Sequence, residues 1–175
     1  MTEQFSDRKA ARKLICLSAL GVFLIGVSLT ELLPKKLVWN ASTSIPIGFY
    51  LIRDSAPKRN DIVLVRLPDW VTLIAGQRGY LPRKIPALKR VSALAGDRVC
   101  RFGGMIIVNG KASAKARLFD NLGRRMPYWH GCVTLNTKQV LLLADHPNSF
   151  DGRYIGVTET ADIMGVALPL WVHVK

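Results

Sequence analysis

The chain begins with a basic segment that is followed by a long apolar stretch. Residues 14–30 carry no charged side chain, and two leucines after Glu31 extend the stretch to residue 33. At about 1.5 Å per helical residue, residues 14–33 reach about 30 Å, the thickness of the hydrocarbon core of a bilayer. The pattern therefore predicts a transmembrane helix over residues 14–33 that anchors the protein.

The flanking charges predict how this helix is oriented. Residues 1–13 contain four basic and two acidic side chains. Such a bias keeps residues 1–13 in the cytoplasm and sends residues 34–175 across the membrane. A cleaved secretory signal is the rival interpretation, but Leu-Leu-Pro-Lys-Lys stands where a signal would have small residues. A buried core helix is less favoured, because the basic flank and the length both argue for a membrane.

After residue 44, short apolar runs separated by turn residues are typical of β-strands. We expect strands at residues 62–65, 105–108 and 140–143, and a hairpin turn at Asn109-Gly110. Residues 68–87 and 111–131 are expected to be irregular inserts. The sequence therefore predicts a mainly β, antiparallel domain of short strands, curled or partly closed, over residues 34–175.

The positive charge belongs mostly to this domain. The chain has a formal net charge of +13, and residues 34–175 contribute 21 Lys/Arg against 9 Asp/Glu. A basic excess is typical of proteins that bind nucleic acid or an anionic membrane surface. The basic residues are scattered, and no recognition helix or RNA-binding signature stands out. We therefore expect no nucleic acid partner and favour attraction to anionic lipid headgroups.

Three cysteines are present, and one of them, Cys16, lies in the apolar stretch. Cys100 and Cys132 are expected outside the cytoplasm, where disulfides persist. A Cys100–Cys132 disulfide and two free thiols are both compatible with the sequence. No Cys/His cluster has the spacing of a metal site, so neither a metal nor a cofactor is expected.

Residues 40–50, Asn-Ala-Ser-Thr-Ser-Ile-Pro-Ile-Gly-Phe-Tyr, contain the first candidate chemistry. Ser42 and Ser44 precede Pro46, which fixes its own φ and favours an extended residue before it. Gly48 permits a turn or a close approach by another chain. Such a rigid strand entry can present a serine hydroxyl to a substrate. An ordinary Ser/Thr-rich turn is the alternative.

Lys89 enters an apolar strand shortly before a Gly96-Asp97 turn. A serine nucleophile needs a base close to it, and the three histidines of the chain have no obvious triad setting. A lysine serves as the base when it is neutral, and burial lowers its usual pKa of about 10.4 by as much as about 3–5 units. For Lys89 taken alone, a solvated strand lysine is the alternative.

A third stretch places a hydroxyl, a carboxylate and a guanidinium at alternate positions: Ser149, Asp151 and Arg153. Side chains two residues apart share a face of an extended segment. We therefore expect Ser149 to orient Lys89, and Asp151 and Arg153 to pair and brace the site. The Asn-Ser and Asp-Gly dipeptides here also make ordinary turns, which is the alternative.

Together and in this order, these stretches resemble the signal peptidase I clan, and most closely its conjugative-transfer branch, the TraF-type maturation peptidases. The resemblance covers residues 8 to about 160. Its boxes are residues 42–50 for the nucleophile, 61–65 for the next strand, 89–91 with Gly96-Asp97 for the general base, and 148–154 with Gly156 for the last motif. The chain departs from relatives at Gly152, where many have Ser.

The resemblance implies a serine peptidase with a Ser/Lys dyad and the signal peptidase β-fold. Ser44 would be the nucleophile and neutral Lys89 the general base. The backbone N–H of Ser44 and the hydroxyl of Ser42 would form the oxyanion hole. Ser149 would orient Lys89, and the supporting residues would be Asp151 and Arg153.

The resemblance also implies a substrate and a location. The branch matures the pilin precursor of a conjugative transfer apparatus, and some members join the ends of the pilin through an acyl-enzyme. The implied location is the periplasmic face of the inner membrane, and other conjugative-transfer proteins are expected partners.

Three rival interpretations stay open. A general leader peptidase would act on many exported proteins, although Ile45 followed directly by Pro46 favours the transfer branch. A membrane-tethered, non-enzymatic subunit of a transfer machine would keep its function without Ser44 and Lys89. A nucleic-acid-binding domain is supported by charge alone and predicts salt-sensitive DNA binding.

Overall fold

The computed structural model describes residues 12–23, 26, 37–82 and 84–173. The chain divides into two compact units, Met1–Lys35 and Lys36–Lys175. In the first unit, residues 12–23 and residue 26 are helical. The described residues contain no helix that is both long and apolar enough to cross a membrane. Residues 24–25 and 27–33 of the predicted anchor lie outside the described residues, as do residues 1–11, so the anchor over 14–33 stays a prediction.

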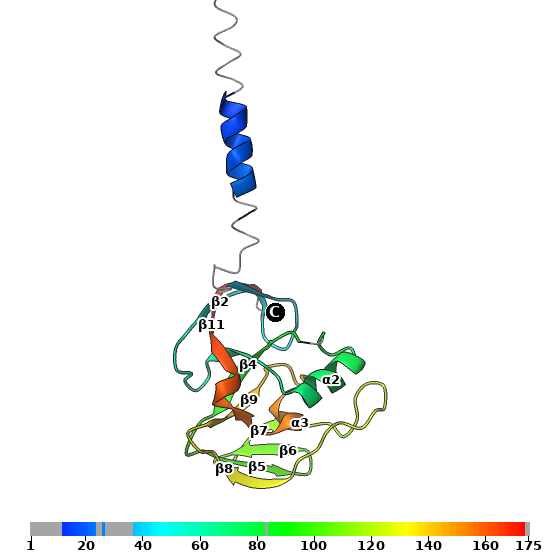
Figure 1. The fold of residues 1–175 in the computed structure, drawn as a ribbon. Helices are drawn as coiled ribbons and strands as arrows, with labels where there is room; N and C mark the ends of the chain where they lie inside the picture. Colours follow the sequence, from blue (N-terminus) through cyan, green and yellow to red (C-terminus); the bar gives the residue numbers. More distant parts are fainter. Residues whose placement is uncertain (1–11, 24–25, 27–36, 83, 174–175) are drawn as a thin grey trace, which may run out of the picture. The chain divides into compact units, whose positions relative to one another are not determined.

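The second unit is built on two sheets (Figure 1). The strand order of the seven-stranded sheet is β1 (Leu37–Asn40), β2 (Ile47–Arg53), β11 (Ile163–His173), β3 (Ile62–Val65), β4 (Ala87–Ala93), β9 (Gln139–Leu143) and β10 (Thr158–Glu159). The four-stranded sheet has the order β7 (Lys111–Lys115), β6 (Met105–Val108), β5 (Arg98–Phe102) and β8 (Gly131–Thr134). All strand pairs described between residues 37 and 173 are antiparallel, which confirms the mainly β, antiparallel prediction.

The strongest local signals of the sequence give the expected elements. The runs at residues 62–65 and 105–108 are β3 and β6, and the run at 140–143 lies in β9. Asn109 and Gly110 connect β6 to β7 with φ values of 50° and 79°. A two-residue hairpin with positive φ at both positions twists in the same sense as its strands, so Asn-Gly suits this turn.

Neither predicted insert is wholly irregular. The first contains the helix α2 (Asp69–Gln77), and the second begins with β7. Val71 and Ala75 are one helical turn apart and both are buried, so α2 packs a narrow apolar stripe against the domain. Asp69 in the first turn favours this helix through its dipole. Two short helical turns complete the domain: α3 (Gly152–Ile155) and η1 (Thr160–Asp162).

The alternation of side chains along the strands places Lys89 on an apolar face of the large sheet. Val63 and Val65 belong to one buried cluster with Val71 of α2, whereas Leu64 belongs to a second cluster on the other face. Lys89 is directly opposite Val63 in the β3–β4 ladder. Directly opposed residues of an antiparallel pair share a face, so the Lys89 side chain leaves the sheet on the face covered by α2.

The close approach expected at Gly48 is present. Gly48 lies opposite Val172 in the β2–β11 ladder, and a Cβ added to Gly48 would lie 2.1 Å from the carbonyl oxygen of Trp171. Only glycine therefore fits at this position. The contact fixes the beginning of β2, and with it the end of the loop that carries Ser42 and Ser44.

Candidate active site

The loop that carries Ser44 is fastened by one buried amide, that of Asn40 at the end of β1. The Asn40 Nδ2 group donates to the carbonyl oxygens of Ser42, Ile45 and Pro46 at 3.0, 2.9 and 3.0 Å. The Asn40 Oδ1 atom accepts from the Ser42 N–H at 3.1 Å. A single side chain thereby satisfies four backbone groups of the loop, which fixes the backbone around Ser44.

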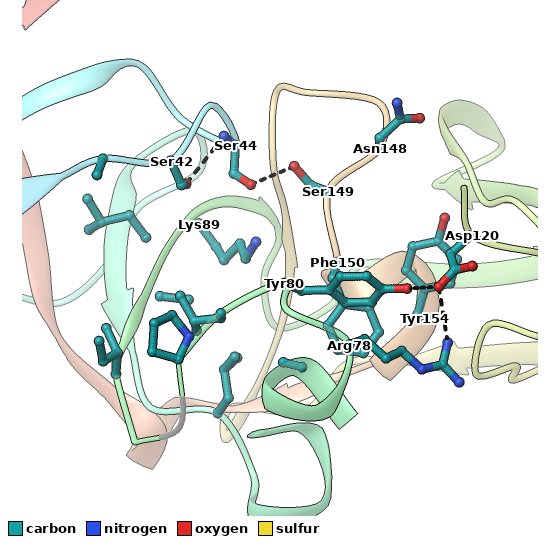
Figure 2. A pocket seen from close by; sticks show the side chains of 18 of the residues that line it. Ser42, Ser44, Arg78, Tyr80, Lys89, Asp120, Asn148, Ser149, Phe150 and Tyr154 are labelled. Atoms are coloured by element: carbon teal, nitrogen blue, oxygen red, sulfur yellow. Dashed lines mark hydrogen bonds and ion pairs between the residues drawn. The ribbon is translucent and has the colours of Figure 1, made fainter. Parts of the chain in front are cut away.

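Ser42 and Ser44 lie together at the tip of this loop. The backbone N–H of Ser44 donates to the Ser42 Oγ atom at 3.4 Å (Figure 2). This hydrogen bond is long and therefore weak. A substrate oxygen that displaces this weak contact would lie close to both the Ser44 N–H and the Ser42 hydroxyl. This is the arrangement that an oxyanion hole made of the two predicted donors requires.

Ser149 brings the third predicted stretch to the nucleophile. The Ser149 hydroxyl donates to the Ser44 Oγ atom at 2.9 Å, across 105 positions of sequence. The sequence argument pairs Ser149 with Lys89, whereas the hydrogen bond described for the Ser149 hydroxyl goes to Ser44. A hydroxyl at this distance can donate to the Ser44 oxygen when a base takes the proton of Ser44.

Lys89 points into the same pocket as Ser44 and Ser149 (Figure 2). The residue is buried, with 6% of its surface exposed. Burial lowers the pKa of the Lys89 amine from its usual value, because an apolar surrounding disfavours the charged form. The nearby Asp151 carboxylate opposes this shift, and the Arg153 guanidinium adds to it.

Asp151 and Arg153 form a buried ion pair with an N–O distance of 2.6 Å. The Asp151 carboxylate also accepts from the N–H groups of Ala144 at 2.8 Å and Arg153 at 3.0 Å. Arg153 donates in turn to the Ala144 carbonyl oxygen at 3.0 Å. Burial raises the pKa of Asp151, but the Arg153 guanidinium opposes that shift. The pair ties the end of β9 to α3 and holds the segment that carries Ser149.

The packing around Gly152 explains why this chain has glycine where many relatives have Ser. A Cβ added to Gly152 would lie 2.6 Å from the carbonyl oxygen of Leu142 and 2.8 Å from the Leu141 side chain. In this chain α3 therefore lies directly against the backbone of β9. Because Gly152 separates Asp151 from Arg153, this close approach sets the position of both members of the ion pair.

The pocket that Ser42, Ser44, Lys89 and Ser149 line has a volume of about 760 Å³. Apolar side chains form part of its lining, among them Leu64, Leu88 and Ile85. The pocket continues to Tyr80, Asp120 and Asn148 (Figure 2). A pocket of this size accommodates several side chains of a bound peptide, and its apolar lining excludes water from the reacting groups.

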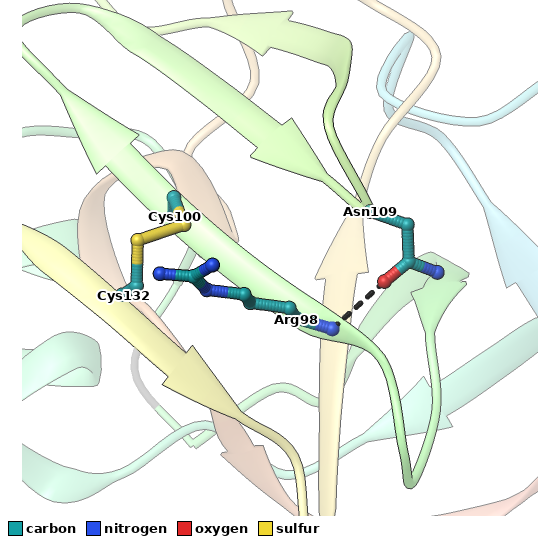
Figure 3. The surroundings of a disulfide bond; sticks show 4 residues. All are labelled: Arg98, Cys100, Asn109 and Cys132. Carbon is teal, nitrogen blue, oxygen red and sulfur yellow. Dashed lines mark hydrogen bonds between the residues drawn. A yellow bond between two sulfur atoms is a disulfide. The ribbon is translucent and has the colours of Figure 1, made fainter.

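Cys100 and Cys132 face each other across β5 and β8, and their sulfur atoms are bonded at 2.03 Å (Figure 3). The disulfide joins two strands of the small sheet, and neither cysteine lines the pocket. Its place in the molecule is therefore structural. The hairpin next to it is fastened by Asn109, whose Oδ1 atom accepts from the Arg98 N–H at 2.8 Å.

The structure thus gathers Ser42, Ser44, Lys89 and Ser149 at one pocket and the Asp151–Arg153 pair behind them. Sequence reasoning missed Asn40, and it missed the pocket wall made by Tyr80 and Asp120. An Asn that directly precedes a Ser/Thr-rich loop is a local signal for capping of that loop. No sequence signal relates Tyr80 to Asp120, because they are 40 residues apart and meet only in the fold.

Comparison with known proteins identifies the family. Residues 9–171 match the family described as signal peptidase, peptidase S26. The chain is 34% identical over 143 residues to a plasmid transfer protein TraF from Escherichia coli, covering 75% of this chain and 80% of that protein. It is 31% identical over 139 residues to a probable conjugal transfer protein TraF from Sinorhizobium fredii, covering 73% of each.

Among solved structures, a signal peptidase I from Enterococcus faecalis is similar with a TM-score of 0.37 and 19% identity, over 65% of this chain and 98% of that one. That similarity is too partial to carry an argument. The match to the family spans most of the chain, and the two relatives exceed 30% identity over most of theirs. The chain therefore belongs to the signal peptidase family, peptidase S26.

Proposed function

We propose that the protein is a serine endopeptidase in which Ser44 is the nucleophile and Lys89 the general base. Membership of the signal peptidase family implies a serine peptidase. The observation that carries the assignment is the 2.9 Å hydrogen bond between Ser149 and Ser44 in the pocket that also contains buried Lys89. These are the nucleophile, a base whose pKa is lowered by burial and an orienting hydroxyl.

The first half of the reaction forms an acyl-enzyme. Neutral Lys89 takes the proton of the Ser44 hydroxyl as the Ser44 oxygen attacks the substrate carbonyl carbon. The negative charge that develops on the carbonyl oxygen is stabilised by the Ser44 N–H and the Ser42 hydroxyl. The C–N bond then breaks, the departing amine takes the proton from Lys89, and an ester to Ser44 remains.

The second half releases the product. Lys89 takes a proton from the incoming nucleophile, which attacks the ester carbon, and Ser44 recovers its proton from Lys89. When the nucleophile is water, the product is a linear peptide with a new carboxylate. When it is the amine at the other end of the same substrate, the product is cyclic and no water is consumed.

The substrate we propose is the pilin precursor of a conjugative transfer apparatus. The relatives described as plasmid or conjugal transfer proteins support a role in conjugation. We further propose that residues 14–33 anchor the chain in the inner membrane with the peptidase domain in the periplasm. The basic residues before the apolar stretch support this topology, as does the Cys100–Cys132 disulfide, because disulfides persist outside the cytoplasm.

The experiment is mass spectrometry of the pilin precursor co-expressed with wild type, Ser44→Ala or Lys89→Ala. We expect a loss of mass with wild type that both variants abolish. A further deficit of one water identifies the cyclic product. Processing that continues in both variants would show that Ser44 and Lys89 are not the dyad, and it would favour a non-enzymatic role for this chain.

A further inference from the structure

The pocket extends beyond the proposed dyad to an end that is rich in arginine. Among the residues that the structure describes, the charged side chains that line the pocket, apart from Lys89, are Arg78, Arg117, Asp120 and Arg124. This end therefore carries three guanidinium groups and one carboxylate. The proposed acyl transfer needs none of these residues, so their concentration beside the site requires another explanation.

The single carboxylate is fully engaged in holding the wall of the pocket. Asp120 accepts from the Tyr80 hydroxyl and lies 4.0 Å from Arg78 (Figure 2). It also accepts from the Arg124 Nε atom at 2.7 Å. Burial raises the pKa of Asp120, but these hydrogen bonds outweigh burial and hold the pKa well below its usual value. Asp120 is therefore ionised, and its charge is balanced within its own cluster.

Arg117 is held differently. Its guanidinium donates to the amide oxygen of Asn121 at 2.8 Å and to that of Asn148 at 3.3 Å. Its backbone N–H donates to the Tyr154 hydroxyl at 3.1 Å. Within the described residues no carboxylate forms an ion pair with Arg117. Amide oxygens orient a guanidinium without neutralising its charge, so Arg117 presents a fixed positive group to solvent.

A short chain of contacts links this positive group to the reacting atoms. Asn148, which holds Arg117, is the neighbour of Ser149, and Ser149 contacts the Ser44 hydroxyl. Figure 2 shows Asn148 and Asp120 on the same side of Ser149. An extended peptide advances about 3.3 Å per residue. When the scissile carbonyl of a substrate is bound at Ser44, a residue a few positions away from the scissile bond therefore reaches Arg117 with its side chain.

We propose that Arg117 is a specificity-determining residue that binds a carboxylate of the substrate polypeptide close to the scissile bond. The carboxylate comes from an acidic side chain or from the C-terminus of the peptide. Guanidinium and carboxylate match in shape and charge, and the two asparagines lower the entropic cost by holding the guanidinium in place. The inference rests on the proposed function, because it takes the ligand to be the peptide that Ser44 attacks.

The test measures binding without turnover. Full-length protein with Ser44→Ala, in detergent, is titrated into fluorescein-labelled peptides that carry Glu or Gln at successive positions of one sequence, and into peptides with free or amidated C-termini. We expect one Glu position, or one free C-terminus, to bind about tenfold more tightly than its neutral partner. The two sets of peptides distinguish a side chain from a terminal carboxylate.

Two further variants assign the preference to Arg117. Adding Arg117→Gln should abolish it, whereas Arg66→Gln, which removes an exposed arginine that does not line the pocket, should leave it intact. Arg117→Glu should favour Lys in place of Glu at the same position, a reversal that a merely structural role would not produce. The preference should weaken as salt is added, because Arg117 is exposed.

The inference is overturned if no peptide pair shows a preference or if the preference survives Arg117→Gln. Turnover of the same peptides by wild type tests the proposed function separately. Cleavage without any carboxylate preference would disprove the Arg117 site and would still support the proposed peptidase activity. A carboxylate preference that depends on Arg117, without any cleavage by wild type, would support the binding site and contradict the proposed peptidase activity.

Discussion

Arg153 neutralises Asp151 directly behind the pocket that contains Lys89. The two side chains are 6% and 0% exposed, and their ion pair has an N–O distance of 2.6 Å. An unpaired carboxylate in this position would favour the protonated form of Lys89. The pair therefore lets the segment after β9 carry a carboxylate without keeping the proposed base charged.

This relationship predicts opposite pH shifts for the two members of the pair. Asp151 raises and Arg153 lowers the pKa of Lys89. Asp151→Asn should lower that pKa further, so that the acidic limb of kcat/KM moves to lower pH. Arg153→Gln should raise it and move the limb to higher pH. The measurement is peptide cleavage across pH, with Asp145→Asn as a matched control that leaves the limb in place. Shifts in the same direction would contradict the account.

The same pair predicts that replacing Asp151 destabilises the folded protein far more than replacing Asp145. Asp151→Ala leaves Arg153 buried without its partner and should lower the free energy of unfolding by about 3–5 kcal/mol. Asp145→Ala removes an equally short ion pair with Arg90, but those side chains are 45% and 31% exposed. That change should cost less than about 1 kcal/mol. Urea titration of both variants measures the two costs, and equal costs would contradict the expectation that a buried, unpaired Arg153 is costly.

Asn40 is predicted to act through the nucleophile loop. Asn40→Ala removes the donor that fastens three carbonyl groups around Ser44. A misplaced nucleophile should lower kcat by about a hundredfold, while KM changes little because the pocket walls remain. Asn40→Asp keeps the acceptor for the Ser42 N–H but not the donor, so it should rescue little. Steady-state kinetics separates these results, and a change confined to KM would mean that Asn40 shapes the pocket instead.

The disulfide is predicted to contribute stability without touching the chemistry. Cys100 and Cys132 are 32 positions apart, and loops of this order are stabilised by about 2–4 kcal/mol when closed. Replacing both cysteines by serine should lower the free energy of unfolding by that amount and leave kcat/KM unchanged, because neither cysteine lines the pocket. Alkylation and mass spectrometry with and without reductant first establish that the bond forms in the cell. A loss of activity in the folded double variant would oppose this assignment.

Local patterns were sufficient for part of the fold. The bounds of β3 and β6 follow from short apolar runs between turn residues, and Asn109-Gly110 gives a hairpin because its backbone preference is local. The helix α2 was missed because only Val71 and Ala75 mark its buried stripe. The long strand β11 was missed because Gly165 and Pro169 interrupt its apolar pattern, and its pairing with β2 and β3 is a property of the fold.

The candidate site, too, could be predicted from the sequence only in part. Ser44, Lys89 and Ser149 follow from three separate motifs, and the fold brings all three to one pocket. The contact between Ser149 and Ser44, the support from Asn40 and the charged wall around Asp120 depend on residues that meet only after folding. Spacing along the chain carries no information about such contacts.

The most direct test of the central claim is to trap the acyl-enzyme. Full-length wild type is mixed with a substrate peptide, quenched in acid and examined by intact mass and peptide mapping. We expect an added mass equal to that of the N-terminal fragment of the peptide minus one water, located on Ser44 and absent from Lys89→Ala. An adduct on another residue, or cleavage that persists in Ser44→Ala, would contradict it.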